Sequence, residues 1–297
     1  MLVHRFSSPV IPSRVVLLGA GGFLAPVLRR HLEATGILVS TFGSREIDLT
    51  SPDAAKQLAK VVQPGDSIVM AAALTPDKGR DIATLSRNLR MCENVCEALG
   101  QTSPAHFIYV SSDGVYDAKF SSLLSEDSTC EPTDLYTLMH IARERMIEHA
   151  CRSRQVPLGV VRPCAIYGPG DTHNSYGPNR YVRTALKDAR ISLFGEGEER
   201  RHHVYVDDVA EIIRLCILHQ STGTINAITG EALSFFQIAE MIAAEAGREV
   251  KIECSPRAST VTHRHFDVTA LARAFPSFRA TPLRKGLSAT ISAADEA

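Results

Sequence analysis

The stretch that decides the fold reads Arg14-Val15-Val16-Leu17-Leu18-Gly19-Ala20-Gly21-Gly22-Phe23-Leu24-Ala25. A β-rich apolar run is followed directly by glycines, which lead into a helical segment over residues 23–34. Glycine permits a tight turn and a close approach of the backbone to a diphosphate, and a helix N-terminus offers free N–H groups. The pattern alone is weak, but its place between a strand and a helix predicts a dinucleotide-binding turn rather than a plain connection.

Strands and helices are expected to alternate after this turn. The expected strands cover residues 37–42, 67–70, 107–110 and 158–162, and the expected helices cover residues 52–62, 84–99 and 136–153. Such alternation predicts an α/β fold with a doubly wound parallel sheet of the Rossmann type. Beyond Arg162 the pattern is less regular and richer in Gly, Pro, Arg and His. We therefore expect a dinucleotide-binding domain at 1–162 and a smaller substrate-binding α/β lobe at 163–297, with about 204–220 returning to the main sheet.

Composition excludes several classes of protein. The chain has 297 residues, 44% hydrophobic and 22% charged, with a formal net charge of −1. A near-neutral chain without a long basic run is a poor candidate for nucleic-acid binding. Its apolar runs are too short to span a bilayer, and residues 1–13 lack the layout of a signal peptide. We expect a soluble protein with no nucleic-acid or membrane partner.

The cysteines indicate the compartment. Seven are scattered along the chain, and only Cys92 and Cys96 lie close together, at helical spacing and with no His pair to complete a metal site. We expect reduced thiols, a cytoplasmic location and no bound metal.

The end of the second expected strand indicates which cofactor is bound. An acid there would bind the 2′-hydroxyl of NAD, whereas an Arg would bind the 2′-phosphate of NADP. The segment has no acid at the strand end and carries Ser44 and Arg45 instead. This favours NADP, with NAD as the alternative. Glu46 makes a salt bridge with Arg45 plausible, and that would weaken the assignment.

Three residues stand out as a catalytic set with one member changed. Tyr136 and His140 are four residues apart, so they share one face of a helix. Ser112 ends the apolar run that starts at His106. Ser, Tyr and Lys in this order would mark a short-chain dehydrogenase/reductase, but His stands where Lys is expected.

The chain resembles the extended short-chain dehydrogenase/reductases, the NAD(P)-dependent nucleotide-sugar epimerase, dehydratase and 4-keto-reductase family. The resemblance covers nearly the whole chain, with its motifs in the family's order. Those motifs are Gly19 to Ala25, Asp48-Leu49-Thr50, Met70-Ala71-Ala72-Ala73, Asn88, Ser111 to Tyr116, Arg162-Pro163 with Tyr167-Gly168-Pro169, and Arg201 to Asp208.

The resemblance implies the site residues and the assembly. The catalytic residues would be Ser112, Tyr136 and His140. The cofactor-binding residues would be Gly19, Gly22, Phe23, Leu24, Ser44, Arg45, Asp48, Leu49, Ala71, Ala72, Ala73, Asn88, Tyr136, His140 and Pro163. The substrate-binding residues would be Asp113, Asn179 and Arg201, of which Arg201 would hold the diphosphate of a nucleotide sugar. Asp208 is expected to be structural, and His202 and His203 to lack chemical roles. The family commonly forms homodimers through the Tyr-bearing helix and the helix before it, and Leu138, Ile141, Met146 and Ile147 are candidates for that contact or for the core.

The family's shared step is hydride transfer between a sugar carbon, usually C4, and the nicotinamide. Tyr136 would move the proton on the sugar oxygen, and Ser112 would hydrogen-bond that oxygen. The family's Lys also lowers the tyrosine pKa, because a charge about 5 Å away at an effective dielectric near 20 contributes about two pKa units. A neutral His140 would lose most of this effect, unless Glu144, one turn further on, keeps it protonated.

Departures from the family narrow the reaction. Gly114 stands where dehydratases carry Glu and the GDP-fucose-synthase branch carries Cys, and Ala165 replaces an Asn. Simple redox at one carbon remains, either C4 epimerisation or reduction of a 4-keto sugar. The alternatives are a catalytically weak NADP-binding or sensing protein that keeps the fold, and an enzyme acting on other carbonyl or hydroxyl substrates.

Overall fold

The computed structural model describes residues 2–116, 123–171, 177–257 and 260–295. A six-stranded parallel sheet forms its larger part, in the order β2-β1-β3-β4-β5-β9. The strands are β1 (Arg14–Leu18), β2 (Val39–Phe42), β3 (Asp66–Met70), β4 (His106–Val110), β5 (Leu158–Pro163) and β9 (Gly223–Ala227). This confirms the predicted Rossmann fold.

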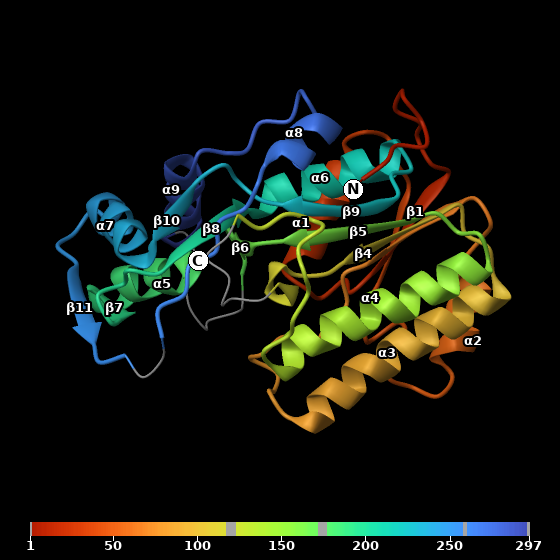
Figure 1. Ribbon diagram of the computed structural model, residues 1–297, viewed down its shortest axis with the longest axis horizontal. Helices are drawn as coiled ribbons and strands as arrows, with labels where there is room; N and C mark the ends of the chain where they lie inside the picture. Colours follow the sequence, from red (N-terminus) through yellow and green to blue (C-terminus); the bar gives the residue numbers. More distant parts are fainter. Residues whose placement is uncertain (1, 117–122, 172–176, 258–259, 296–297) are drawn as a thin grey trace.

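Helices cover both faces of the sheet (Figure 1). One face carries α2 (Ala54–Val61), α3 (Ile82–Gln101) and α4 (Leu135–Ser153), and the other carries α1 (Leu24–Glu33) and α6 (Val206–Leu218). The first strand shows why, because Val15 and Leu17 enter the core beneath α1 and α6, whereas Val16 and Leu18 enter the core beneath α2 and α3. Successive side chains of a strand point to opposite faces, so an unbroken apolar run must be covered on both.

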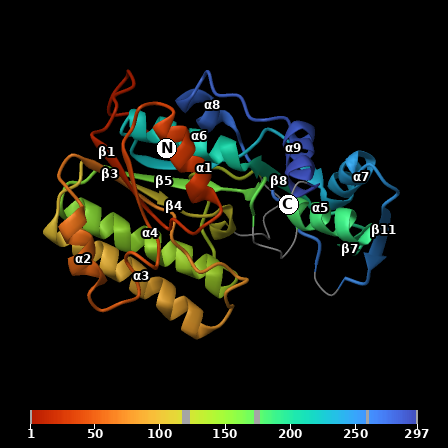
Figure 2. The same cartoon turned by 180° about the vertical axis from the view of Figure 1, so that it is seen from behind.

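The remaining elements form a lobe at one end of the sheet (Figure 2). A three-stranded sheet joins β6 (Ala165–Tyr167), β8 (Arg200–Tyr205) and β10 (Ala232–Ser234), and a two-stranded sheet joins β7 (Arg190–Phe194) and β11 (Lys251–Ser255). The helices of the lobe are α5 (Pro178–Asp188), α7 (Phe235–Glu245) and α9 (Leu283–Asp295), whereas α8 (Thr269–Ala274) packs on the main sheet beside β9. α5, α7 and α9 share a separate apolar core with β7, which includes Ile191, Leu193 and Ile242.

The chain returns from the lobe to the main sheet through α6 and β9. α6 packs against α1, and β9 pairs with β5 as the last strand of the sheet. β5 ends at Pro163 and β6 begins at Ala165, so the lobe starts at the carboxyl end of a central strand. Ligands of such sheets bind at that end.

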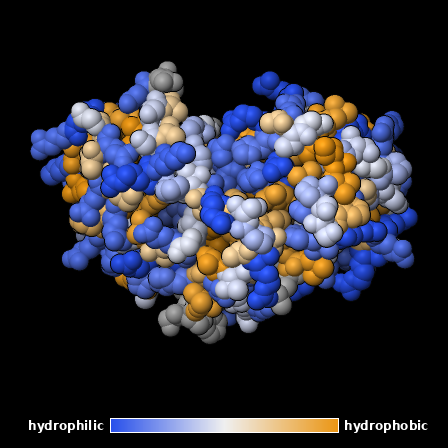
Figure 3. All heavy atoms as spheres, turned by 90° about the horizontal axis from the view of Figure 1, so that it is seen from above, coloured by the Kyte–Doolittle hydropathy of each residue, from blue (hydrophilic) through white to orange (hydrophobic). Residues whose placement is uncertain are grey.

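Hydrophilic and hydrophobic residues are mixed over the face shown in Figure 3. In the part of the chain that the structure describes, no helix combines the length and apolar character that crossing a bilayer requires.

Candidate active site

The glycine turn joins the carboxyl ends of β1 and β3. Gly19 has a φ of +107°, and a Cβ at this position would lie 2.8 Å from the backbone N of Ala72. Only glycine fits so close an approach. The turn therefore meets the strand-end alanines Ala71, Ala72 and Ala73, which the sequence assigns to the nicotinamide side.

The rest of the turn forms an open cradle before α1. The N–H of Gly22 donates to the carbonyl of Gly19 at 3.0 Å, and no atom of the described residues lies within 4 Å of a Cβ built on Gly21. α1 begins at Leu24 without a side-chain cap from Phe23, so its first N–H groups are available to an anion. These features fit a dinucleotide diphosphate.

Ser44 and Arg45 are exposed in the turn after β2. The carboxylate of Glu46 accepts the N–H of Gly43 at 2.8 Å. Within the described residues, Glu46 forms no ion pair with Arg45, so the salt bridge that its position made plausible is not formed. The Arg45 guanidinium stays exposed beside the end of β2.

Asp48 and Leu49 shape the next loop rather than pointing together into one pocket. The carboxylate of Asp48 accepts the backbone N–H and the hydroxyl of Thr50 at 2.9 and 2.8 Å. Leu49 is buried, and its carbonyl accepts the Asn94 amide at 2.8 Å.

Asn88 holds the loop that follows the strand-end alanines. Its side-chain oxygen accepts the N–H of Leu74 at 2.9 Å, and its amide donates to the Leu74 carbonyl at 3.0 Å. Asn88 is buried in α3, so it supports the loop after the strand-end alanines from behind.

Two neighbouring serines follow β4, and the structure separates their roles. The Ser111 hydroxyl is buried and donates to Glu144 at 2.6 Å. The Ser112 hydroxyl accepts the N–H of Gly114 at 3.0 Å and, within the described residues, donates to no acceptor. Ser112 is therefore the serine whose hydroxyl hydrogen is available to a ligand, as its sequence position predicts.

Gly114 brings Ser112 close to the start of α4. A Cβ on Gly114 would lie 2.8 Å from Cγ2 of Thr137 and 3.2 Å from Oγ of Ser112. Thr137 is the next residue after Tyr136, so the serine turn packs against the helical turn that carries the tyrosine. Gly114, which stands where dehydratases of the resembled family carry Glu, also permits this close packing.

The beginning of α4 is well defined, and this positions Tyr136. Asp134 accepts the Thr137 N–H at 2.8 Å, and the Thr137 hydroxyl accepts the Asp134 N–H at 3.3 Å. This reciprocal pair is a capping box, with Thr in place of the usual Glu. Tyr136 lies in the first turn and is half-buried.

His140 lies one turn below Tyr136 and is 2% exposed. Its ring meets the Tyr136 ring edge to face, with centroids 4.7 Å apart at 88°. Its Nδ1 shares a hydrogen bond with the Tyr109 hydroxyl at 2.8 Å, whereas its buried Nε2 has no partner among the described residues. Tyr109 belongs to β4, and its apolar sequence context gave no indication of this role.

Glu144 does not keep His140 protonated, which was one of the two alternatives that the sequence left open. Burial, with a further contribution from the charge of Arg143, lowers the pKa of His140 from 6.5 to about 3. The Glu144 carboxylate instead binds the Arg162 guanidinium at 2.6 and 2.9 Å. His140 is therefore neutral near pH 7 and does not replace the charge of a lysine.

Arg162 joins a buried network behind the two serines. Besides Glu144, it donates to the Tyr116 hydroxyl at 2.8 Å, and that hydroxyl donates to Asn226 at 2.8 Å. The network connects α4, β5 and β9 beneath the serine turn. Pro163, the next residue along β5, is buried at the strand end.

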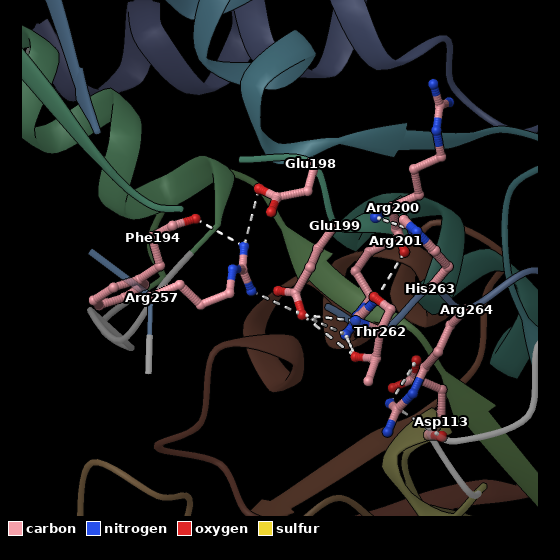
Figure 4. Close-up of polar contacts among 10 residues, drawn as sticks. All are labelled: Asp113, Phe194, Glu198, Glu199, Arg200, Arg201, Arg257, Thr262, His263 and Arg264. Carbon is pink, nitrogen blue, oxygen red and sulfur yellow. Dashed lines mark hydrogen bonds and ion pairs between the residues drawn. The ribbon is translucent and has the colours of Figure 1, made fainter. Parts of the chain in front are cut away.

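The lobe brings a cluster of arginines and carboxylates to the same end of the sheet (Figure 4). The Arg201 guanidinium donates to the carbonyl and, at 2.7 Å, to the hydroxyl of Thr262, and it lies 3.8 Å from Glu199. Arg257 lies 3.2 Å from the same Glu199 oxygen and 3.3 Å from Glu198. The side chain of Arg200 points away from this cluster in Figure 4.

A third arginine reaches the serine turn. Arg264 lies 3.4 Å from the carboxylate of Asp113, the residue after Ser112. The sequence singled out Arg201 and Asp113, but Arg257 and Arg264 were missed because no motif surrounds them. The only indication of these two arginines in the sequence was the local abundance of basic residues in the lobe.

The other lobe residues named from the sequence support the fold of this region. Asn179 is buried, accepts the Gly168 N–H at 3.1 Å and donates to Asp171 at 2.6 Å. Asp208 accepts the N–H and the hydroxyl of Thr281 at 2.8 and 2.7 Å, which confirms its structural role. Within the described ranges, no cluster of three His, Cys, Asp or Glu side chains is arranged to hold a metal ion.

A doubly wound parallel sheet with a glycine cradle after its first strand, and with Ser112 and Tyr136 beside its fourth, defines a dinucleotide-binding protein of the short-chain dehydrogenase type. The sequence profile of the NAD dependent epimerase/dehydratase family matches residues 15–228, and the chain belongs to this family. The resemblance inferred from the motifs is thereby confirmed.

Relatives are similar over most of the chain at low identity. GDP-mannose 3,5-epimerase 1 from Oryza sativa subsp. indica is 24% identical, over 93% of this chain and 80% of that protein. The dTDP-4-dehydro-6-deoxy-D-allose reductase of Streptomyces bikiniensis is 25% identical, over 93% of this chain and 94% of that protein.

Solved structures share the fold. The GDP-L-fucose synthetase of Naegleria fowleri bound to NADP has a TM-score of 0.83 at 18% identity, with 98% of this chain and 97% of that chain covered. The UDP-glucose 4-epimerase of Thermus thermophilus in complex with NAD has a TM-score of 0.83 at 19% identity, with 96% and 99% covered.

Proposed function

We propose that this protein is an NAD(P)-dependent oxidoreductase or epimerase that acts on a nucleotide sugar by hydride transfer at one carbon, C4 epimerisation or 4-keto reduction. The observation that carries the proposal is the meeting of the Ser112 turn and the first turn of α4 through Gly114, at the end of the sheet that also holds the glycine cradle. The similar proteins include a UDP-glucose 4-epimerase and a 4-dehydro-sugar reductase, which supports keeping both reactions.

The cradle at Gly19 and the uncapped start of α1 fit a nicotinamide dinucleotide, and when bound its nicotinamide accepts or donates hydride. We propose NADP as the preferred form, because Ser44 and Arg45 are exposed at the end of β2 and Glu46, among the described residues, forms no ion pair with the guanidinium. The further cofactor residues proposed from the family are Gly22, Phe23, Leu24, Asp48, Leu49, Ala71, Ala72, Ala73, Asn88, His140 and Pro163.

Tyr136 is proposed to move the proton at the sugar oxygen. It gives that proton when a ketone is reduced and takes it when a hydroxyl is oxidised. The Ser112 hydroxyl donates a hydrogen bond to the same oxygen and stabilises its developing charge. Ser112 can do this because its hydroxyl accepts the Gly114 N–H and keeps its own hydrogen for a ligand.

The arginine cluster of the lobe is proposed to bind the diphosphate of the nucleotide sugar. Arg201 and Arg257 share a single oxygen of Glu199 at 3.8 and 3.2 Å, which are long distances for ion pairs. A diphosphate offers more acceptors at shorter range to the same two guanidinium groups. Asp113, with Arg264 beside it, and Asn179 are proposed to bound the sugar side of this site.

We also propose a homodimer through α3 and α4. A shallow groove on their outer face is lined by Cys96, Met146 and Ala150 among polar residues, and Leu138 on the same helix is 41% exposed. Ile147, one of the residues considered for this contact, lies in the core at 0% exposure. Sedimentation of the purified protein measures the assembly directly.

One observation favours a second candidate, a catalytically weak NADP-binding or sensing protein. His140 is neutral near pH 7, so the charge that the family's Lys provides is absent at that position. Replacing His140 with Lys separates the two. In the His140→Lys variant, a protein whose active site has lost catalytic power should gain activity. An enzyme adapted to His should instead lose activity or shift its pH optimum.

The proposed function is tested by turnover of a panel of nucleotide sugars and 4-keto sugars, with NADP(H) and NAD(H) compared. We expect kcat of the Tyr136→Phe variant to fall by a factor of about 10² to 10⁴. Dinucleotide affinity should not change, because only the hydroxyl that transfers the proton is removed. The matched control is Tyr205→Phe, a half-buried lobe tyrosine, which should leave kcat unchanged. Dinucleotide binding with no turnover of any sugar would refute the enzyme and leave the sensing protein.

A further inference from the structure

Arg143 is a guanidinium buried at 0% exposure whose partners among the described residues are neutral. It donates to the Asn88 carbonyl at 2.9 and 2.6 Å, to the Asn88 side-chain oxygen at 3.1 Å and to the Ala72 carbonyl at 2.7 Å. Within the described ranges of the chain, no carboxylate forms an ion pair with it. In this part of the protein its positive charge is therefore not neutralised by a counter-ion.

An unpaired buried charge is costly for the folded state. The other buried arginine of this region, Arg162, follows the usual rule and is matched by Glu144 at 2.6 Å. The hydrogen bonds from this side chain to Asn88 and Ala72 require donors, but those donors need not be charged. The retained charge therefore indicates a role beyond packing.

The position of Arg143 connects the two halves of the candidate active site. It lies seven residues after Tyr136 on α4 and hence on the same helix face, about 10 Å along the axis. Its guanidinium ends at Ala72, the residue that meets Gly19 in the glycine turn. It thus connects the helix that carries Tyr136 to the strand end beside the glycine turn.

The space between Arg143 and Tyr136 is filled by buried side chains. His140 is 2% exposed and packs edge to face on Tyr136, and Tyr109 is 1% exposed and hydrogen-bonded to His140 at 2.8 Å. Burial raises the pKa of the Tyr109 phenol, and the Arg143 charge opposes that rise, so the guanidinium acts on this pair. A charge acting through such a dry path is screened less than one acting through water.

We propose that Arg143 is the positioning residue that supplies the positive charge for Tyr136, in place of the Lys that the family carries where this chain has His140. Tyr109 holds His140 as the neutral spacer between them. The inference rests on the proposed hydride-transfer function, because it assigns a source for the field at the general acid–base.

Among the residues that the structure describes, the other ionisable groups beside this pair are less well placed to provide a positive charge. From α3, Cys92 lies with its sulfur 3.9 Å from the Arg143 carbonyl, and a cysteine side chain carries no positive charge in either protonation state. The pocket beside Tyr136 is lined by Arg80, Asp81 and Asp134, which are exposed to water and therefore screened. Glu144 is occupied by Arg162.

The test compares the pH dependence of turnover in three variants. A charge about 10 Å away at an effective dielectric near 20 shifts a pKa by about one unit. Arg143→Gln should therefore raise the apparent pKa of Tyr136 by about one unit, and Arg143→Lys should leave it unchanged. Arg145→Gln is the matched control, because this arginine lies on the same helix with its side chain 74% exposed, and it should shift nothing.

A second variant neutralises the charge without removing the arginine. Asn88→Asp places a carboxylate at the position now 3.1 Å from the Arg143 guanidinium, with almost no change in shape. It should raise the apparent pKa of Tyr136 by a similar amount even if Arg143→Gln does not fold. A folded Arg143→Gln or Asn88→Asp protein with an unshifted pKa overturns the proposal.

A readout without substrate keeps this test separate from the proposed function. The Tyr136 phenol can be titrated in the NADP-loaded protein by tyrosinate absorbance, taken as the difference between each protein and its Tyr136→Phe counterpart. A shift by this method, together with no turnover of any nucleotide sugar, would support the role of Arg143 in the field and refute the proposed enzyme. No shift alongside normal sugar turnover would overturn the role of Arg143 alone.

Discussion

The buried charges beside the sheet and the charges in the lobe are arranged in opposite ways. Under the serine turn, Glu144 and Arg162 form a close pair at 2.6 Å, with side chains 11% and 8% exposed. In the lobe, one oxygen of Glu199 is shared by Arg201 and Arg257 at 3.8 and 3.2 Å (Figure 4). The first arrangement is a short, buried ion pair, whereas the second gathers two guanidinium groups around a single carboxylate oxygen at longer distances. We infer that the first region holds the catalytic groups in place and that the second binds substrate.

Glu144→Gln gives the largest expected effect. Removing one partner of a buried ion pair leaves the other charge unmatched, so we expect a loss of about 3–5 kcal/mol in the free energy of unfolding. Glu199→Gln, its matched change in the lobe, should cost less, because the ion pairs there are longer, at 3.8 and 3.2 Å. Urea unfolding measures both variants, and equal losses would remove the distinction between the two regions.

Acid should destabilise the protein through its buried histidines. Burial lowers the pKa of His140 and of His203 from 6.5 to about 3 and that of His106 to about 4. Between these values and 6.5 the unfolded chain binds more protons than the folded one. The contribution of these histidines to stability is therefore fully present above pH 6.5 and is lost as the pH is lowered.

His140 alone should contribute on the order of 4 kcal/mol to this loss. The measurement is the free energy of unfolding from pH 7 down to pH 4, for the wild type and for His140→Gln. A variant whose pH slope equals that of the wild type would show that His140 is not the group that titrates.

The lobe arginines should control substrate affinity. Arg257→Gln is expected to raise the KM for the nucleotide sugar about tenfold to a hundredfold, because a charge-assisted phosphate contact is lost. kcat should change less, since Arg257 lies away from Tyr136 and Ser112. The neighbouring Arg200, which points away from the cluster in Figure 4, serves as the control, and Arg200→Gln should leave KM unchanged. If both variants raise KM equally, a general charge effect replaces the proposed binding site.

Arg45→Ala should have the smallest effect. An exposed guanidinium on a 2′-phosphate contributes about 1 kcal/mol, so NADPH affinity should fall about fivefold to tenfold while NADH affinity is unchanged. Calorimetry with both dinucleotides measures this. An equal loss for both would assign Arg45 to the loop rather than to the phosphate, and tightly retained NAD in the purified protein would favour the epimerase.

Local sequence patterns were sufficient to predict the strands and helices of the half of the molecule that contains the main sheet. The expected strands and helices of the first 162 residues are all present, with ends shifted by at most two residues. Their apolar runs are short, unbroken and punctuated by Gly and Pro, so the local signal agrees with the global fold. For the lobe, the sequence predicted its existence but not its individual strands and helices. Its strands are short and pair across long stretches of chain, such as β7 with β11.

The candidate site divides in the same way. Gly19, Ser112 and Tyr136 were named from motifs, because each lies at a strand end or helix start whose local sequence is distinctive. Tyr109, Arg143 and Arg257 were not, because nothing around them in the chain differs from core or surface sequence. Their roles arise from what lies opposite them in the fold.

The sequence by itself determined the Rossmann sheet, its glycine turn and the replacement of Lys by His140, since these depend on residue type at a fixed spacing along the chain. Only the tertiary structure decided the charge state around Tyr136. Glu144 is one helical turn from His140 in sequence, yet it turns to Arg162 on β5, and Arg143 lies buried with no carboxylate of the described residues beside it. Burial and partner choice depend on what packs from other strands and helices, and a pKa follows from those neighbours rather than from position in the chain.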